Sequence, residues 1–302
     1  ELGAMANSRA QVRVFSDDGK CVFDPLIMRR ALEYVKTFGG VIAQHAQEPR
    51  LTVDAQMNEG EVSARLGLAG WPAVAEESII ARDVLLAEHT GSRLHICHLS
   101  TAGSVDVIRW AKKRGIAVTA EVTPHHLLLT DESARGYSPL FKVNPPLRTR
   151  EDVEAVRAGV ADGTIDIVAT DHAPHTSATK DCTWSDAAFG MVGLESALPI
   201  VQATLVDTGL ITWADVARIL STTPARIGQV ARYDTPLAVG SPANITLVDT
   251  SYRSVWGTDR LAGGSHNTPF SGIELPGRIV STLFRGTETV IDGTVVDEVR
   301  TA

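Results

Sequence analysis

The sequence predicts an α/β protein of the (β/α)8-barrel class, with a small β-rich appendage near the end of the chain. From Val12 to about Leu210, short apolar runs alternate with amphipathic segments of helical period, as in repeated βα units around a parallel sheet. Several of these apolar runs end in an aspartate or a histidine. Because barrel enzymes carry their functional side chains at the carboxyl ends of the strands, this second observation favours the same fold class.

The alternation predicts five βα units. The strands are expected at residues 12–16, 41–44, 94–97, 117–122 and 165–170. The helices that follow them are expected near residues 25–38, 76–89, 103–114, 150–161 and 192–206.

Local signals support these helices. Pro25 suits a first helical turn, and Gly39-Gly40 suits the stop of the same helix. Thr149 and Asp152 have the spacing of a capping pair at the start of the fourth helix. Residues 165–170, IDIVAT, form an apolar β-rich run directly before an acid, which indicates a buried strand that ends at a functional residue.

After Leu210 the pattern changes. A helix is expected near residues 212–220, followed by β-rich stretches at 236–240, 243–249, 279–284 and 289–293. The expected domains are therefore a partial barrel over residues 1–225, which carries the metal-binding strands four to eight, and a small β-rich domain with a tail over residues 226–302.

Five βα units do not close a barrel of eight, so about three units are missing from the pattern. Residues 1–5 resemble the end of a helix, and the sequence is therefore expected to begin partway through a larger protein. Residues 1–302 expressed alone are expected to associate through the exposed strand edges and to be inactive.

Composition excludes several classes of function. The formal net charge is −8, from 36 acidic and 28 basic residues without a large basic cluster, which disfavours nucleic acid and anionic membranes as partners. No apolar run approaches the ~20 residues of a membrane span, and the first residues do not form a signal peptide, so a cytoplasmic location is expected. Cys21, Cys97 and Cys182 lie far apart and are expected to be reduced thiols.

Four predicted strands end in side chains that bind metals: Asp18, His45, His98 and Asp171. One such strand end is usually structural, but four in one chain indicate a single metal site. Two imidazoles and two carboxylates suit zinc better than calcium, and zinc activates water for the hydrolysis of an unactivated amide. His175 is expected to reach an anionic part of the substrate. For His95, His125 and His126, packing or hydrogen bonding is the preferred interpretation.

Residues 175–189 follow the last of these strands and are rich in Ser, Thr, Ala and Asp. They are expected to form a mobile loop over the substrate, with Lys180 and Asp181 solvated.

Six segments together carry a resemblance to a known family: residues 15–19 (FSDDG), 41–45 (VIAQH), 95–98 (HICH), 121–126 (EVTPHH), 142–148 (KVNPPLR) and 171–175 (DHAPH). Over essentially the whole chain, they resemble the class I dihydroorotases of the amidohydrolase superfamily. Hydantoinases and allantoinases have a similar layout but use a carboxylated lysine as the bridging ligand, where this sequence has a carboxylate.

The resemblance implies a role for each matching residue. Asp18 would bridge two zinc ions, His45 and His98 would hold the second zinc, and Asp171 would bind the first zinc and act as general base. Substrate contacts are implied for Asn144, for His175, and for the backbone around Phe189 and Gly190.

One departure from the family concerns the first zinc. The family's first barrel strand carries a His-x-His-x-Arg motif, which supplies two ligands and a substrate-binding arginine, and neither it nor the Asn-Thr segment of the next strand occurs here. The first zinc would keep only Asp171 and Asp18. Arg148 and His175 are expected to be able to attract an anion without replacing the missing ligands.

The expected function is reversible hydrolysis of L-dihydroorotate to N-carbamoyl-L-aspartate in pyrimidine biosynthesis. Two alternatives stay open: another cyclic amidohydrolase of the hydantoinase or allantoinase type, and a non-catalytic dihydroorotase-like scaffold for aspartate transcarbamoylase. A homodimer also stays open.

Overall fold

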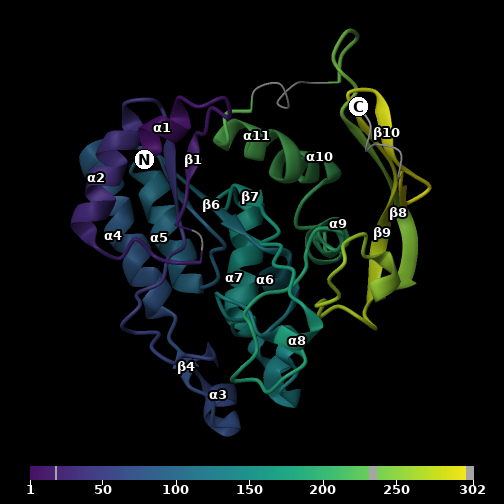
Figure 1. Ribbon diagram of the computed structural model, residues 1–302, viewed down its shortest axis with the longest axis horizontal. Helices are drawn as coiled ribbons and strands as arrows, with labels where there is room; N and C mark the ends of the chain where they lie inside the picture. The colour runs from purple at the N-terminus through teal and green to yellow at the C-terminus, as the bar shows by residue number, and fades with distance from the viewer. Residues whose placement is uncertain (18, 231–236, 297–302) are drawn as a thin grey trace.

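A parallel sheet of five strands, in the order β1-β2-β5-β6-β7, forms the centre of the computed structural model, which describes residues 1–17, 19–230 and 237–296 (Figure 1). The strands are β1 (Val14–Phe15), β2 (Val41–Gln44), β5 (Leu94–Ile96), β6 (Val118–Val122) and β7 (Ile167–Val168). Every neighbouring pair is parallel. The five predicted strands and the predicted fold class are confirmed.

Each strand is followed by a helix that packs on the sheet. The first four helices, α2 (Pro25–Lys36), α4 (Val74–Thr90), α5 (Ala102–Lys113) and α7 (Arg150–Ala161), agree with the expected ranges to within about two residues. The fifth, α9 (Ala197–Val201), continues into a π-helical turn, η3 (Gln202–Val206).

The fifth helix begins later than residue 192, where the sequence pattern placed it. Met191 forms a parallel bridge with His172, and the backbone N–H of Val192 donates to the carbonyl of Asn267. This backbone is therefore committed to extended pairing, and the apolar run cannot be helical over its whole length.

Capping hydrogen bonds explain where α2 and α7 begin. Asp24 accepts hydrogen bonds from the backbone N–H groups of Leu26 and Ile27, and Pro25 occupies the first turn of α2. Thr149 and Asp152 form a reciprocal capping box at the start of α7, as their spacing predicted.

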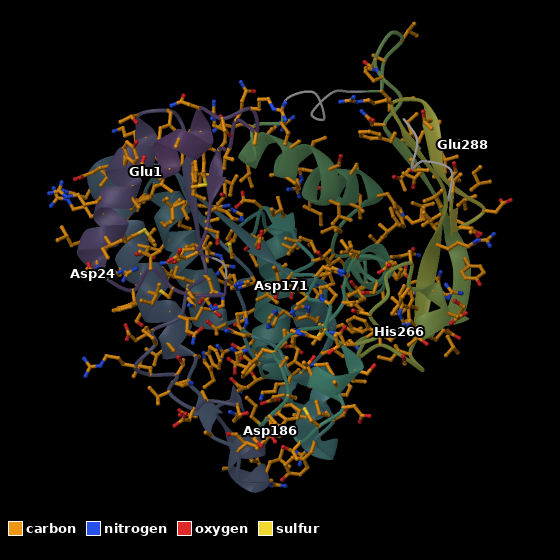
Figure 2. The ribbon with its side chains drawn as sticks, in the orientation of Figure 1. Glu1, Asp24, Asp171, Asp186, His266 and Glu288 are labelled. Atoms are coloured by element: carbon orange, nitrogen blue, oxygen red, sulfur yellow. The ribbon has the colours of Figure 1, made fainter. Side chains whose placement is uncertain are left out.

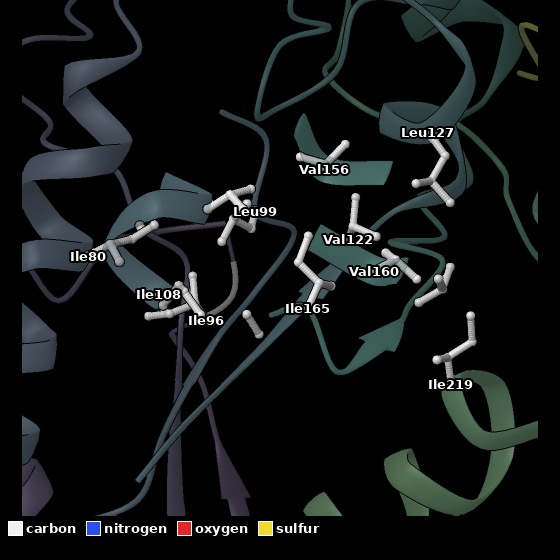
Figure 3. Close-up of a cluster of buried hydrophobic side chains, with 14 of the residues drawn as sticks. Ile80, Ile96, Leu99, Ile108, Val122, Leu127, Val156, Val160, Ile165 and Ile219 are labelled. Atoms are coloured by element: carbon white, nitrogen blue, oxygen red, sulfur yellow. The ribbon is translucent and has the colours of Figure 1, made fainter. Parts of the chain in front are cut away.

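The core lies between the sheet and these helices. Figure 3 shows Ile108 from α5 beside Ile96 from β5, and Val156 and Val160 from α7 near Val122 from β6. These side chains are almost completely buried. They hold the helices against one face of the sheet and fix the ends of the strands relative to one another.

Smaller elements are inserted after the strands. β3 (Met57–Asn58), α3 (Glu61–Leu66) and β4 (Gly70–Trp71) lie between β2 and α4. α6 (Pro124–Leu128), η1 (Asp131–Gly136) and η2 (Pro139–Phe141) follow β6, and α8 (Ser177–Lys180) follows β7. Because they all leave the carboxyl ends of parallel strands, they gather on the side of the sheet where a barrel enzyme has its site.

The last part of the chain forms a second sheet. After α10 (Trp213–Ala217), η4 (Arg218–Thr222) and α11 (Thr223–Ile227), the antiparallel strands lie in the order β11-β10-β9-β8, on the right in Figure 1. Their bounds are β8 (Ile245–Val255), β9 (Glu274–Phe284), β10 (Thr287–Ile291) and β11 (Thr294–Val295). Two short helices, α1 (Leu2–Ala6) and η6 (Thr258–Arg260), complete the described elements. The predicted β-rich appendage is confirmed.

One strand expected in this region is wrong. Residues 237–240 form a turn, closed by the backbone N–H of Ser241 on the carbonyl of Ala238, and Val239 is fully exposed. Gly240 has a φ of +92°, which ends any extended run. The first residue of the predicted strand, Pro236, lies outside the described residues. The domain boundary at residue 225 stays a prediction.

Within the described ranges, no helix combines the length and the apolar character that a membrane crossing requires.

Replacement of Thr149 by Ala should lower the free energy of unfolding by about 1 kcal/mol, because it removes the capping hydrogen bond to the N–H of Asp152. Urea unfolding followed by circular dichroism measures the loss. Thr130→Ala is the matched control, since Thr130 stands at the N-cap of η1 without a side-chain cap hydrogen bond. Equal losses in the two variants would show that the cap contributes nothing.

Candidate active site

The predicted site residues follow strands that are paired in register. Gln44 pairs with Ile96, Ile96 with Ala120, and Val122 with Val168, so the carboxyl ends of these strands lie at one edge of the sheet. His45 comes directly after β2, His98 two residues after β5, and Asp171 three residues after β7. Asp18, which follows β1, lies outside the described residues.

His45 and His98 are brought together, although 53 residues separate them in sequence. His45 Nδ1 and His98 Nε2 are 2.9 Å apart, and the two rings meet edge to face with centroids 4.6 Å apart. Both side chains are buried. Two imidazole nitrogens from different strand ends therefore face each other at hydrogen-bond distance.

Gln47 orients His45 from the other side. His45 Nε2 donates to Gln47 Oε1 at 2.8 Å, and the same oxygen accepts from Asn144 Nδ2 at 3.2 Å. A neutral imidazole that donates from Nε2 keeps its lone pair on Nδ1, the nitrogen that faces His98. Gln47 thus links a predicted metal ligand to a predicted substrate contact. The sequence analysis missed Gln47, because its contact to Asn144 joins residues 97 apart.

Of the two polar atoms in the Asn144 side-chain amide, one has a hydrogen-bond partner and the other has none among the described residues. Its Nδ2 is engaged by Gln47, whereas its Oδ1 is buried without a hydrogen-bond partner among the described residues. A buried carbonyl oxygen in this state is an acceptor available to a ligand.

Burial keeps His98 neutral. Its pKa lies well below the ordinary value of 6.5, first because the ring is desolvated and second because His45 and His126 are close. The backbone of His98 is left-handed, with a φ of +33°, and its N–H donates to Glu121 Oε1 at 3.3 Å. Such strained backbone in a non-glycine residue is common at functional sites.

Asp171 shares this backbone feature, with a φ of +47°. In Figure 2 it lies near the centre of the molecule, between the parallel sheet and the loops that lead to the C-terminal sheet. The two predicted ligands that follow β5 and β7 are therefore both presented by left-handed residues, which turn the chain sharply at the strand end.

The three histidines expected to be structural do pack or form hydrogen bonds. His95 contacts Thr119 Oγ1 and Glu121 Oε2 at 2.8 and 3.0 Å. His126 contacts Thr123 Oγ1 and the carbonyl of Pro146. His125 packs against His126, and its Nε2 is buried without a partner among the described residues.

His175 lies against the Phe189-Gly190 backbone, and the substrate contacts that the resemblance implies for these residues stay a prediction. His175 Nε2 donates to the carbonyl of Phe189 at 2.8 Å, and the N–H of Gly190 donates to the carbonyl of Lys142. Gly190 has a φ of +128°, and a Cβ there would lie 2.6 Å from that of Ala173. Glycine is therefore required where the chain passes His175.

The interpretation of residues 175–189 needs a correction. Lys180 is only 4% exposed, against the expectation that it is solvated, whereas Asp181 is exposed as expected. Lys180 Nζ donates to the carbonyls of Lys142 and Ala188, and burial lowers its pKa from 10.5 to about 8. Trp184 and Ala187 are buried as well. The segment packs on the protein; its motion on substrate binding stays a prediction.

The expectation for Arg148 was also wrong. The guanidinium is buried, and it donates to Ser100 Oγ, Asn58 Oδ1 and the carbonyl of Trp71. Glu76 lies 3.8 Å away. Arg148 therefore joins the β3-β4 insertion to α4 inside the protein, where it is not available to attract an anion.

The arrangement fits part of the predicted zinc site. In residues 1–17, 19–230 and 237–296, no group of three or more His, Cys, Asp and Glu is placed to hold a metal ion. The His45–His98 pair nevertheless supplies two facing nitrogens, one held in the required tautomer, and both imidazoles suit zinc.

Gln44 and Asp83 fix the strand that carries His45. Gln44 Nε2 donates to Asp83 Oδ2 at 2.8 Å, and Gln44 Oε1 accepts from the N–H of Val22. Asp83 is fully buried on α4, and burial raises its pKa from 3.8 to about 6, although Arg82 lies beside it and lowers it.

A family model described as Dihydro-orotase-like matches residues 2–104. A dihydroorotase from Leifsonia xyli subsp. xyli is 69% identical over 299 residues, which cover 99% of this chain and 68% of the relative. A dihydroorotase from Streptomyces coelicolor is 68% identical over 293 residues, with 97% and 68% covered.

The fold has distant relatives among solved structures. A dihydropyrimidinase from Brevibacillus agri superposes with a TM-score of 0.81 at 21% identity, over 98% of this chain and 67% of that chain. At this identity the likeness concerns the fold alone, and it agrees with the predicted barrel class of the amidohydrolase type.

Stability should depend on the protonation of Asp83. Its pKa is higher in the folded state than its ordinary value of 3.8, so the folded protein binds more protons, and the free energy of unfolding falls as pH rises from about 4 to about 6. Asp83→Asn should remove this contribution, which urea unfolding at several pH values measures. In the control Asp106→Asn, a surface residue, the slope should be that of the parent. A slope unchanged in Asp83→Asn would contradict the account.

Proposed function

The chain belongs to the dihydroorotase family, and on this premise we propose that its site hydrolyses the ring amide of L-dihydroorotate reversibly to N-carbamoyl-L-aspartate. The observation that carries the proposal is identity of 68–69% to dihydroorotases over nearly the whole chain. The hydantoinase-type alternative has only distant structural relatives in its favour, at 21–26% identity.

We also propose that this site holds zinc through His45, His98, Asp171 and Asp18, with two ions per complete subunit. The facing nitrogens of His45 and His98 support it. When bound, zinc lowers the pKa of water towards ~7 and polarises a carbonyl group.

The protein's own side chains would move the proton. The Asp171 carboxylate accepts a proton from the attacking water as that water adds to the ring carbonyl carbon. It then delivers the proton to the ring nitrogen as the C–N bond breaks. The left-handed backbone of Asp171 supports this role, since it turns the residue out of the line of β7 at the strand edge.

Asn144, His175 and the Phe189-Gly190 backbone would orient the substrate. Asn144 Oδ1 would accept a ring N–H, because it is a buried acceptor without a partner among the described residues. His175 and the Phe189-Gly190 backbone would line the same site, and the hydrogen bond from His175 Nε2 to the Phe189 carbonyl holds them together.

The experiment compares hydrolysis of dihydroorotate with that of dihydrouracil, the same ring without the carboxylate, by the complete protein supplied with zinc. Preference for dihydroorotate supports the proposal. Preference for dihydrouracil would favour the hydantoinase type, and turnover of neither would favour the scaffold for aspartate transcarbamoylase.

The cellular location and the assembly of the protein are also proposals. We place the protein in the cytoplasm, with dihydroorotate or N-carbamoyl-aspartate as its small-molecule partner. A homodimer and association with aspartate transcarbamoylase are tested by size-exclusion chromatography with and without that enzyme. Inactivity of residues 1–302 alone stays a prediction.

Replacement of His98 by Ala should weaken zinc binding by at least about 100-fold, because a direct ligand is lost rather than a neighbour of one. Metal analysis after dialysis against a zinc buffer measures this effect without reference to activity. The matched control is His89→Ala, since His89 is exposed in the last turn of α4. Unchanged zinc content in folded His98→Ala protein would remove His98 from the site.

Replacement of Asp171 by Asn should reduce kcat by at least about 1,000-fold, since the substitution keeps the shape but removes the proton acceptor and the ligand charge. Steady-state hydrolysis of dihydroorotate measures the loss, with Asp106→Asn as a surface control. Activity within about tenfold of the parent, or roughly 1.4 kcal/mol of barrier, would show that another group is the base.

A further inference from the structure

Two lysines that the proposed reaction does not use are buried beside the site. Lys142 is 2% exposed and Lys180 is 4% exposed. Lysine is almost never buried to this degree unless its charge is paired. Among the described residues, neither ammonium group forms an ion pair with a carboxylate, and both donate to backbone carbonyls instead.

The Lys142 ammonium group makes three contacts with residues 184–189. Its Nζ donates to the carbonyls of Trp184 and Ser185 at 2.7 and 3.1 Å, and it lies 4.5 Å from the centroid of the Phe189 ring. The third contact is a cation–π interaction with a partly buried ring, which also meets the Trp71 ring edge to face.

The Lys180 ammonium group binds one carbonyl within its own segment and one in residue 142. Its Nζ donates to the carbonyl of Ala188 at 2.8 Å and to the carbonyl of Lys142 at 3.2 Å. The carbonyl of Lys142 also accepts the N–H of Gly190 at 2.9 Å. Two ammonium groups and one shared carbonyl therefore tie residues 180–190 to residue 142.

We propose that Lys142 and Lys180 are positioning residues that together hold the Phe189-Gly190 segment in its substrate-binding conformation and in register with Asn144. The inference rests on the proposed function, since it assigns these lysines to the same site. We call the pair, with the carbonyls it binds, the lysine clamp.

The lysine clamp lies close in sequence to the residues proposed to contact the substrate. Asn144 lies two residues after Lys142, and Phe189 and Gly190 lie directly after Ala188. His175 Nε2 donates to the carbonyl of Phe189, so a displacement of the segment would also release His175. The carbonyls that the lysine clamp binds belong to residues 142, 184, 185 and 188, which are not among the residues proposed to bind zinc.

Loss of an ammonium group would leave backbone carbonyls without donors, and one of them, that of Trp184, lies in the interior. In Lys142→Met the carbonyls of Trp184 and Ser185 lose their bonds to Nζ, and in Lys180→Met the carbonyl of Ala188 does. Carbonyls left without partners in a partly buried segment destabilise its packed conformation, so the segment should open towards water. A methionine of similar length keeps the packing of the stem, which makes the change specific to the charge.

The experiment uses Lys142→Met and Lys180→Met in the complete zinc-loaded protein. Lys36→Met is the matched control, because Lys36 also donates to a carbonyl, that of Thr90, but on the exposed surface of α2. Hydrogen exchange of peptides over residues 181–190 reports the segment itself. Steady-state kinetics with dihydroorotate reports KM and kcat separately.

Each clamp variant should exchange residues 181–190 faster by about tenfold or more and raise KM by about tenfold, with kcat within about threefold and zinc content unchanged. The control should match the parent. Exchange at the parent's rate in a folded clamp variant would overturn the proposal, and so would a loss confined to kcat. Lys180→Arg, which keeps a cation with several donors, should restore part of the protection.

Two further outcomes are distinguished. If Lys142→Met does not fold, Phe189→Leu replaces it, because this variant removes the ring beneath Nζ and leaves the lysine; unchanged exchange there would likewise contradict the clamp. If the parent does not hydrolyse dihydroorotate, the proposed function fails, whereas the exchange measurement still tests whether the lysines hold the segment.

Discussion

The candidate site depends on one constraint, the parallel register of five strands. Val14 pairs with Val41, Ile42 with Leu94, Leu94 with Val118, and Val122 with Val168. Every strand therefore ends at the same edge, and the paired residues named here are separated by 24 to 52 positions along the chain. The buried side chains of the surrounding helices hold this register, because a shift of one residue would turn the alternating side chains to the opposite face.

Buried polar contacts refine what the register provides. Asp83 holds Gln44, the last residue before His45, while Gln47 fixes the tautomer of His45 and binds Asn144. Glu121 accepts the backbone N–H of His98. Each of these groups is satisfied mainly within the protein, so the site is preorganised before a ligand arrives. The left-handed backbone at His98 and Asp171 is tolerated because this surrounding structure fixes it.

The sequence was sufficient for the five strands of the parallel sheet and for the positions of His45, His98 and Asp171 just beyond three of them, since both follow from local apolar runs and their boundaries. It was insufficient for the contacts between distant segments. Arg148 and Lys180 were interpreted as solvent-accessible because a charged side chain is usually exposed, and their burial depends on partners such as Asn58 and Lys142 that no local pattern indicates. Gln47 carried no signal beyond its position two residues after His45. The turn at 237–240 was mistaken for a strand because Leu237 and Val239 alternate with other residues, although both side chains are exposed.

The central claim is that the strand edge assembles a zinc site around His45 and His98. Anomalous scattering from crystals of the complete protein, collected on both sides of the zinc absorption edge, tests it most directly. The account predicts a zinc peak within coordination distance of His45 Nδ1 and His98 Nε2, at about 2.0–2.1 Å from each nitrogen. The absence of a peak between these two rings in zinc-saturated crystals, or a peak held by other residues alone, would contradict it.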